Sequence, residues 1–170
     1  MVAKWNGMAS ALWLNEDEIR LRHCLADAAK AYDWKKTLDI LTSYPDWVNV
    51  ARLDGRSLYT PLHQAAHGNA PVQVVKKMIK MGGWRTLRNV DGETAADIAR
   101  KKSHKRLVKL LSPVYKRYFS AETLDSIQKH FHAIIYNRAG ELVEKYGLRL
   151  PQWEHPNCAK IKEVKLFART

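Results

Sequence analysis

Apolar residues recur along the chain at helical spacing, and the recurrences fall into units of equal length. The segment 60–66 (TPLHQAA) is followed by apolar positions over 72–79 and then by Gly82-Gly83. The segment 94–99 (TAADIA) is followed by apolar positions over 107–111 and then by Pro113. The threonines that open the two segments lie 34 residues apart. Each unit therefore predicts two helices joined by a tight turn.

The same interval extends beyond this pair of units. Ala65, Ala99 and Ala133 follow one another at 34-residue spacing. A weaker copy lies upstream, where apolar residues over 25–29 and 38–41 precede Pro45. The pattern predicts about four helix pairs between residues 15 and 147.

Capping residues support these boundaries. Thr60 is a favoured residue to precede a helix, and Pro61 fits the first helical position, where its missing N–H costs nothing. Asn15 is expected to open the first helix as a variant of the capping box. Asn69 and Asn137 are expected to adopt the left-handed conformation that ends a helix in a tight turn.

Stretches with turn-forming residues separate the helix pairs. Residues 47–55 and 84–92 end in Asp-Gly, which predicts short β-hairpin loops. Beyond Gly147 the periodicity stops, so residues 148–170 form a tail without assigned structure.

The residues of the 60–92 unit resemble an ankyrin repeat, with Thr-Pro-Leu-His at 60–63, paired alanines at 65–66, glycines at 82–83 and Asp91-Gly92-Glu93-Thr94. The segments 60–111 and 131–151 are also similar to bacterial ankyrin-repeat proteins. The resemblance implies an all-α ankyrin-repeat solenoid, in which stacked helix-turn-helix pairs carry short β-hairpin fingers. It implies one domain over residues 1–170.

The match is uneven along the chain. Residues 53–119 hold the two repeats that match best, although Asp97 stands where the family has histidine and Ala95 where it has proline. Residues 1–52 are expected to form an N-terminal cap and a degenerate first repeat. Residues 120–147 are expected to form a degenerate C-terminal helix pair.

The resemblance implies a non-enzymatic protein-protein interaction module that binds an unidentified protein partner through its concave and finger surface. Carried over by position, the partner-binding residues are Arg52, Arg56, Tyr59, Gln64, His67, Arg85, Arg88 and Lys101.

The distribution of charge supplies an alternative. The chain has a formal net charge of +12, of which +11 falls in residues 56–118. A positive surface over residues 76–117 would suit nucleic acid or another acidic polymer. Its candidate residues are Lys76, Lys77, Lys80, Lys102, Lys105, Arg106 and Lys109. The segment lacks the helix-turn-helix, zinc-finger and RNA-recognition signatures, so protein binding is the first hypothesis.

Candidates for catalysis and metal binding are weak. The resemblance implies a structural role for His63, which bonds between adjacent units. His130 and His132 would point about 200° apart on a helix, which does not suit one metal ion. Cys24 follows His23 without a third group to orient the pair. We therefore expect no catalytic residues, no metal and no cofactor.

Length and composition fit a globular protein. The 170 residues are 46% hydrophobic and 27% charged, and they contain no apolar run long enough to cross a membrane. The two cysteines lack the spacing of a disulfide framework and favour a reducing compartment. We expect a cytoplasmic protein that is a monomer.

Overall fold

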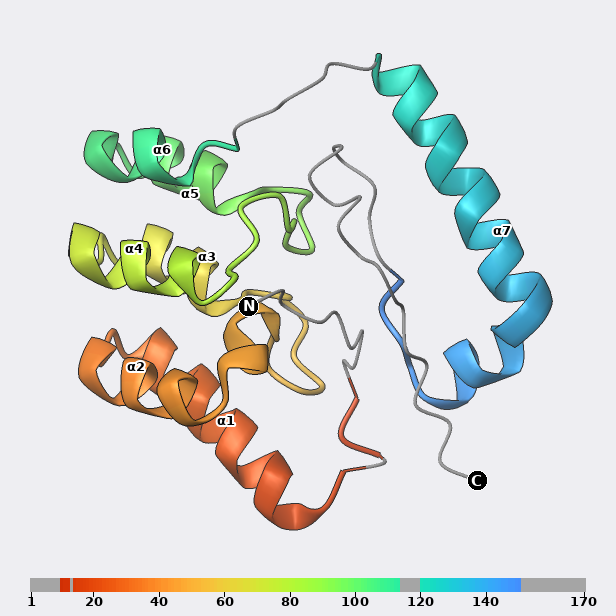
Figure 1. The fold of residues 1–170 in the computed structure, drawn as a ribbon, viewed down its shortest axis with the longest axis horizontal. Helices are drawn as coiled ribbons and strands as arrows, with labels where there is room; N and C mark the ends of the chain where they lie inside the picture. The colour runs from red at the N-terminus through yellow and green to blue at the C-terminus, as the bar shows by residue number, and fades with distance from the viewer. Residues whose placement is uncertain (1–9, 13, 114–119, 151–170) are drawn as a thin grey trace.

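The computed structural model of the protein describes residues 10–12, 14–113 and 120–150. Six helices form three stacked pairs, which confirms the all-α ankyrin-repeat solenoid (Figure 1). The pairs are α1 (Glu16–Lys30) with α2 (Trp34–Ser43), α3 (Pro61–His67) with α4 (Val72–Lys80), and α5 (Ala95–Lys101) with α6 (Lys105–Leu111). The first helices of the pairs pack in one row and the second helices in another.

Local chemistry sets the ends of these helices. The Asn15 side chain accepts a hydrogen bond of 2.8 Å from the backbone N–H of Glu18 and so caps α1, as expected. Asn69 ends the turn after α3 with a φ of 50°, in the left-handed region expected for it. Gly82 has a φ of 102° just after α4, a conformation that glycine adopts without steric cost.

The core lies between successive pairs, where small residues let the helices approach closely. Ala65, Ala66 and Ala99 are fully buried on the first helices. Leu41, Met78 and the leucines of α6 fill the space between the second helices. Each pair therefore buries its apolar face on its neighbours, which is how repeat proteins build a continuous core.

The loops between the pairs differ from the expected hairpins. Residues 45–49 form a 3-10 helix, η1 (Pro45–Asn49), where extended chain was expected from residue 47 onward. Pro45 starts this turn, and Trp47 and Val48 are buried in it. An isolated antiparallel β-bridge joins Arg88 to Thr94, so the second loop is a minimal hairpin.

At residues 120–147, where a degenerate helix pair was expected, α7 (Ala121–Lys145) holds two helical stretches that meet at a kink at Ala139, whose φ of −147° is not helical. Asn137 remains helical and does not form the expected turn. After Asn69 the chain has Pro71 to begin a new helix, whereas after Asn137 no proline interrupts the first one. The helix α7 stands apart from the stack, on the side to which the loops point (Figure 1). The stack therefore has three helix pairs.

His63 joins the second repeat to the third. Its side chain is buried, and the backbone N–H of Thr60 donates to Nδ1 at 3.2 Å. The proton therefore sits on Nε2, which donates to the carbonyl oxygens of Leu87 at 3.1 Å and Glu93 at 3.3 Å. One imidazole thus caps its own helix and holds the next loop, the structural role that the resemblance implied.

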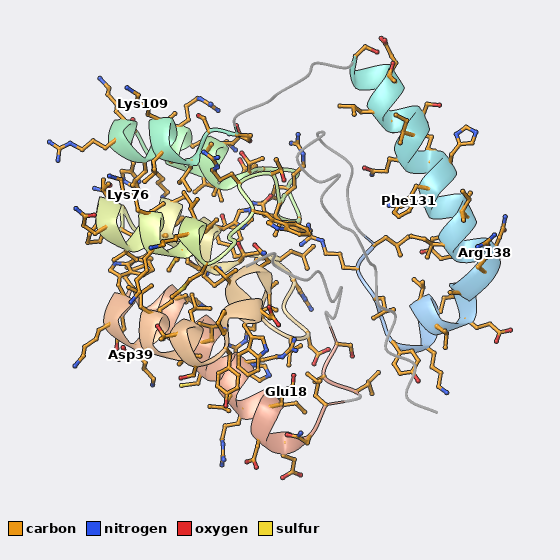
Figure 2. All side chains as sticks on the ribbon, in the orientation of Figure 1. Glu18, Asp39, Lys76, Lys109, Phe131 and Arg138 are labelled. Atoms are coloured by element: carbon orange, nitrogen blue, oxygen red, sulfur yellow. The ribbon has the colours of Figure 1, made fainter. Side chains whose placement is uncertain are left out.

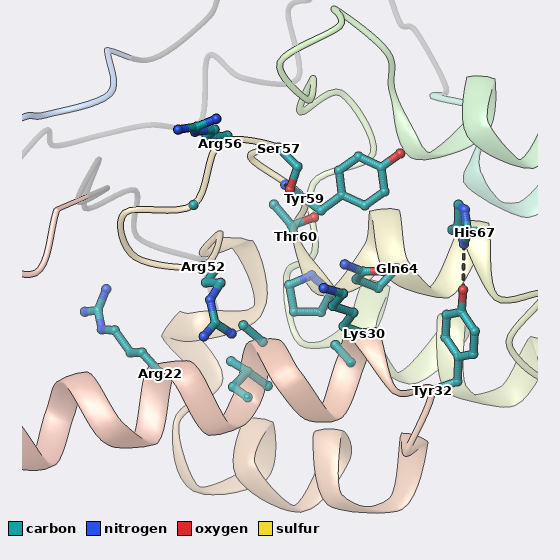
Figure 3. Close-up of a pocket in the computed structure, with 15 residues that line it drawn as sticks. Arg22, Lys30, Tyr32, Arg52, Arg56, Ser57, Tyr59, Thr60, Gln64 and His67 are labelled. Carbon is teal, nitrogen blue, oxygen red and sulfur yellow. Dashed lines mark hydrogen bonds between the residues drawn. The ribbon is translucent and has the colours of Figure 1, made fainter.

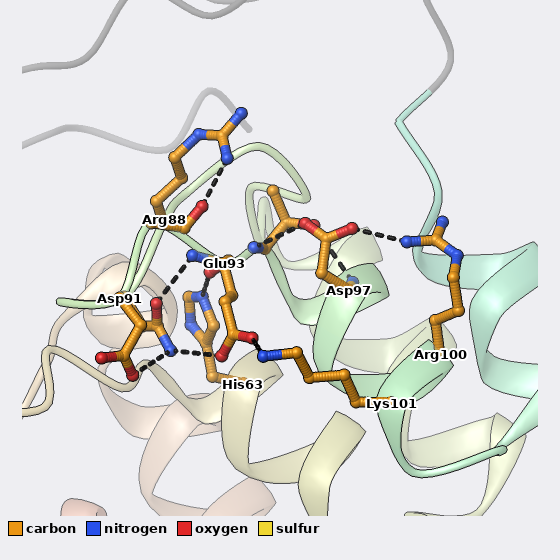
Figure 4. A network of polar contacts seen from close by, with 10 residues as sticks. His63, Arg88, Asp91, Glu93, Asp97, Arg100 and Lys101 are labelled. Atoms are coloured by element: carbon orange, nitrogen blue, oxygen red, sulfur yellow. Dashed lines mark hydrogen bonds and ion pairs between the residues drawn. The ribbon is translucent and has the colours of Figure 1, made fainter.

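Asp97 occupies the corresponding position of the third repeat. Its carboxylate accepts from the Thr94 backbone N–H at 3.0 Å and from the Thr94 hydroxyl at 2.7 Å, which caps α5. Arg100 donates to its other oxygen at 2.6 Å (Figure 4). An ionised carboxylate has no proton to donate to the carbonyls of a following loop. The third repeat can cap itself but has lost this means of binding a fourth.

The buried imidazole makes stability depend on pH. Burial lowers the pKa of His63 from 6.5 to about 4, while the two backbone carbonyls oppose the shift. The unfolded chain therefore binds a proton between pH 6.5 and 4 that the folded chain excludes. We expect the free energy of unfolding to fall by about 3 kcal/mol from this group as pH drops through that window.

Urea unfolding of the wild type and His63→Gln, measured at pH 7 and pH 4, checks this expectation. The variant lacks the titrating group, so its loss between the two pH values should be smaller by about 3 kcal/mol. Equal losses in the two proteins would contradict the role of His63.

Candidate functional site

A pocket of about 460 Å³ opens between the first two repeats (Figure 3). Its walls come from α1, from α3 and from the loop over residues 52–60 that joins the two repeats. Leu25, Ala26, Ala29 and Pro61 provide apolar surface along it. The pocket is therefore a concave space with an apolar floor, a form common in ligand-binding sites.

Five of the eight side chains predicted to bind a partner line this pocket. They are Arg52, Arg56, Tyr59, Gln64 and His67. The first three come from the loop and the other two from α3, so residues separated along the chain meet in one place (Figure 3).

The other three predicted residues lie outside the pocket and serve the third repeat. Arg85 donates to the carbonyl oxygens of Leu110 at 3.3 Å and Ser112 at 3.1 Å, which fixes the end of α6. Arg88 donates to the carbonyl of Gly92 within its own turn (Figure 4).

Lys101, the last of these three, forms an ion pair with Glu93. The hydrogen bond from Lys101 lowers the pKa of the Glu93 carboxyl, and the carboxylate raises the pKa of Lys101 in turn. Both groups are thus charged and directed toward each other. Lys101 holds the second loop against α5.

Ten of the fifteen lining residues were not among those predicted from the sequence, and they include Arg22, Lys30 and Tyr32. A signal for two of them exists, because Arg22, Ala26, Ala29 and Lys30 recur at helical spacing on one face of α1. Tyr32 has no such signal, since it lies in the turn after α1 and reaches the pocket through an unusual backbone conformation.

Tyr32 anchors the aromatic end of the pocket. Its φ is 61°, in the left-handed region that non-glycine residues rarely adopt. Its hydroxyl forms a hydrogen bond of 2.6 Å with Nδ1 of His67, and its ring lies 5.7 Å from that of Trp34. Burial lowers the pKa of His67, with help from the positive charge of Lys102, which favours the neutral imidazole. This contact binds the first repeat to the second.

The opposite end of the pocket is cationic. Arg22 is buried on α1 and pairs with Glu18 at 2.8 Å, while its guanidinium carbon lies 5.1 Å from the centre of the Trp47 ring. Arg52 forms an ion pair with Asp27 at the rim. Arg56 is exposed on the loop (Figure 3).

The basic residues of the alternative hypothesis form a separate surface on the second helices. In Figure 2, Lys76 on α4 and Lys109 on α6 point away from the loops. All seven residues are exposed, and within residues 14–113 and 120–150 none of them has an ion-pair partner. We call this set the convex basic surface: Lys76, Lys77, Lys80, Lys102, Lys105, Arg106 and Lys109.

Comparison with known families and structures supports the fold. The sequence model of the ankyrin repeat matches residues 57–89, which span the loop, α3, α4 and the start of the next loop. Residues 57–89 are an ankyrin repeat. The search of curated proteins found no match.

One similar solved structure is the complex of Bd0816, a predatory endopeptidase from Bdellovibrio bacteriovorus, with immunity protein Bd3460. A chain of that complex is 29% identical, with a TM-score of 0.42, over 51% of this chain and 42% of that chain. This chain thus spans less than half the length of the one it matches, and a likeness of this degree adds no argument about function.

Two further observations concern the residues that the structure describes. None of their helices combines the length and apolar character that a membrane span requires. Their histidine, cysteine and carboxylate side chains form no group of three that could hold a metal ion. Cys24 is a free cysteine.

The Tyr32 contact depends on the absence of a side chain at Gly68. A methyl group there would lie 2.3 Å from Cδ1 of Tyr32, so the ring would have to move. We expect Gly68→Ala to break the hydrogen bond to His67 and to lower the free energy of unfolding by roughly 1 kcal/mol. Urea unfolding and the NMR signals of the two rings measure this.

Gly140→Ala provides the control. A methyl group at Gly140 would lie 3.6 Å from Tyr136, an ordinary contact, and alanine favours a helix over glycine. We expect the free energy of unfolding of Gly140→Ala to be unchanged or raised by up to about 1 kcal/mol. Unshifted Tyr32 and His67 signals in Gly68→Ala would contradict the assigned contact.

Proposed function

We propose that the protein is a non-enzymatic interaction module whose pocket between the first two repeats binds a protein partner. The observation that carries the proposal is the convergence of Arg52, Arg56, Tyr59, Gln64 and His67 on one pocket. Concave surfaces of stacked repeats are used for binding in this architecture, and residues 57–89 contribute six of the fifteen residues that line this pocket.

The pocket has features of a prepared binding surface. Tyr59 is held beside His63, with ring centres 5.6 Å apart, and its ring meets that of His67 edge-on at 6.4 Å. Such fixed aromatic rings offer large contact area with little loss of side-chain freedom on binding. The side chains of Arg56 and Gln64 have no hydrogen-bond partner among the described residues. Their polar groups are therefore available to a ligand at the rim of the pocket.

Site-specific photo-crosslinking tests the proposal. A photoreactive amino acid placed at Gln64, on the pocket, should capture one predominant protein from extracts of the source organism. The same amino acid at Gln73, which is exposed on α4, provides the control. We expect the Gln64 product to exceed the Gln73 product at least tenfold. Equal capture at both positions, or capture from Gln73 alone, would contradict binding through the pocket.

The convex basic surface supports a second candidate function, which is binding to nucleic acid. Its seven exposed cations have no ion-pair partner among the residues that the structure describes, which gives this face an excess of positive charge there. If all seven met phosphates, affinity for a DNA duplex should fall by about 10³ to 10⁴ between 50 and 200 mM salt. Fluorescence anisotropy with a labelled duplex measures this fall.

Charge reversal separates this surface from the overall charge. Lys105→Glu with Arg106→Glu should weaken duplex binding at least tenfold, because two phosphate contacts are lost. Lys35→Glu with Lys36→Glu on α2 makes the same change in net charge outside the surface. A flat salt response, or equal weakening by both double variants, would eliminate this candidate.

We also propose that the protein acts in the cytoplasm as a monomer. The free thiol of Cys24 supports a reducing compartment.

A further inference from the structure

The lining of the pocket carries positive charge without a lining acid. Its charged members are Arg22, Lys30, Arg52 and Arg56. Glu18 and Asp27 pair with two of these from outside the lining. Lys30 and Arg56 have no ion-pair partner among the described residues, so the pocket keeps an excess of positive charge.

Arg22 has a buried nitrogen atom without a hydrogen-bond partner among the described residues. The residue is 4% exposed, and its Nε and Nη2 donate to Glu18 at 3.1 and 2.8 Å. Its Nη1 is buried and has no hydrogen-bond acceptor among the described residues. A buried guanidinium N–H without an acceptor costs free energy, and an acceptor brought by a ligand would recover it. The half-exposed side chain of Arg52, which pairs with Asp27, lies at the same end of the pocket (Figure 3).

The arrangement of charge and rings resembles a binding site with two parts. In Figure 3 the three arginines lie toward one end, Tyr32, Tyr59 and His67 toward the other, and Lys30 and Gln64 between them. Guanidinium groups bind carboxylates in paired, directional hydrogen bonds. The volume of about 460 Å³ suits a few side chains of an extended peptide, whereas a duplex needs a long open surface.

We propose that the pocket binds an acidic segment of the partner protein, with a carboxylate of that segment received by Arg22, Arg52 and Arg56. This inference rests on the proposed function, because it names the chemistry of the segment that enters the same pocket. The rings at the far end contact the residues that follow the carboxylate.

The test uses the full chain and a fluorescein-labelled hexaglutamate peptide, followed by fluorescence anisotropy at about 100 mM salt. We expect saturable binding, and no binding of the hexaglutamine peptide up to 1 mM. Arg56→Glu should weaken hexaglutamate binding at least tenfold, since it places a like charge at the rim. Arg138→Glu on α7 makes the identical change at an exposed residue remote from the pocket and should stay within twofold (Figure 2).

Arg22 needs a conservative variant because its guanidinium packs on Trp47. Arg22→Lys keeps the charge but loses the planar guanidinium, which directs two N–H groups at Glu18 and a separate nitrogen, Nη1, away from them. We expect hexaglutamate binding three- to tenfold weaker in a variant whose thermal unfolding shows a folded protein. Wild-type affinity in the folded variant would overturn the role of Arg22 as a receiver of the carboxylate.

Three outcomes would overturn the proposal as a whole. These are absence of hexaglutamate binding, equal weakening by Arg56→Glu and Arg138→Glu, and displacement of hexaglutamate by oligo(dT) whose own affinity depends on Arg56. The last would make the ligand a nucleic acid. The two proposals can fail separately. If Gln64 still crosslinks to the partner in the Arg56→Glu variant, the pocket remains a protein-binding site, and only the proposal that its ligand is an acidic segment is rejected.

Discussion

The hydrogen bonds of His63 are the interaction on which the stack depends most. One neutral imidazole accepts from the start of α3 and donates to two carbonyls of the next loop, so helix capping and repeat docking share a single side chain. If these backbone groups were left buried without a hydrogen-bond partner, the loss in folding free energy would exceed the net contribution of the hydrogen bonds. These side-chain bonds hold the third repeat on the second, together with a backbone hydrogen bond from the N–H of Val90 to the carbonyl oxygen of Ser57 at 3.1 Å.

Similar contacts tie the remaining junctions. The buried side chain of Asn49 donates to the carbonyl of Gly82 at 3.0 Å and accepts from the N–H of Trp84 at 2.8 Å. Tyr32 contacts His67 across the first two repeats, and His104 donates from the third repeat to the carbonyl of Ala66 at 2.9 Å. Of these contacts, the one between Tyr32 and His67 joins the turn after α1 to α3, and these two helices form walls of the pocket.

Much of this fold could be predicted from the sequence, because its signals are local. The 34-residue period, Thr60-Pro61 and the left-handed Asn69 each act within a few residues and predict the repeats in place. The position of the break in α7, at Ala139 and not at Asn137, could not be predicted, since apolar spacing in 120–147 fits one helix as well as two. Asp97 explains in retrospect why, among the described residues, α7 does not pack on the third repeat as a fourth pair: a carboxylate caps a helix as histidine does, yet cannot donate to a next loop.

The candidate site was partly predictable for a related reason. Arg52, Arg56 and Gln64 follow from their position in a repeat, whereas Arg85 and Lys101, which were predicted to bind a partner, contact α6 and Glu93 within the chain. The partner of a basic side chain, whether a carboxylate or a carbonyl, depends on distances in the tertiary structure. The position of a residue within the repeat does not give those distances. To reach the pocket, Tyr32 needs a rare backbone conformation and the absence of a side chain at Gly68. Neither condition can be predicted from a local sequence pattern.

Native-state hydrogen exchange of wild type and His63→Leu tests most directly whether His63 couples the repeats. Leucine fills a volume similar to that of histidine but can form neither the hydrogen bond with Thr60 nor those with the carbonyl oxygens of Leu87 and Glu93. The account predicts that amides of α3, of α5 and of the loop at 84–94 lose protection together, while α7 is unaffected. Loss of protection confined to α3, with α5 and the loop unchanged, would contradict it.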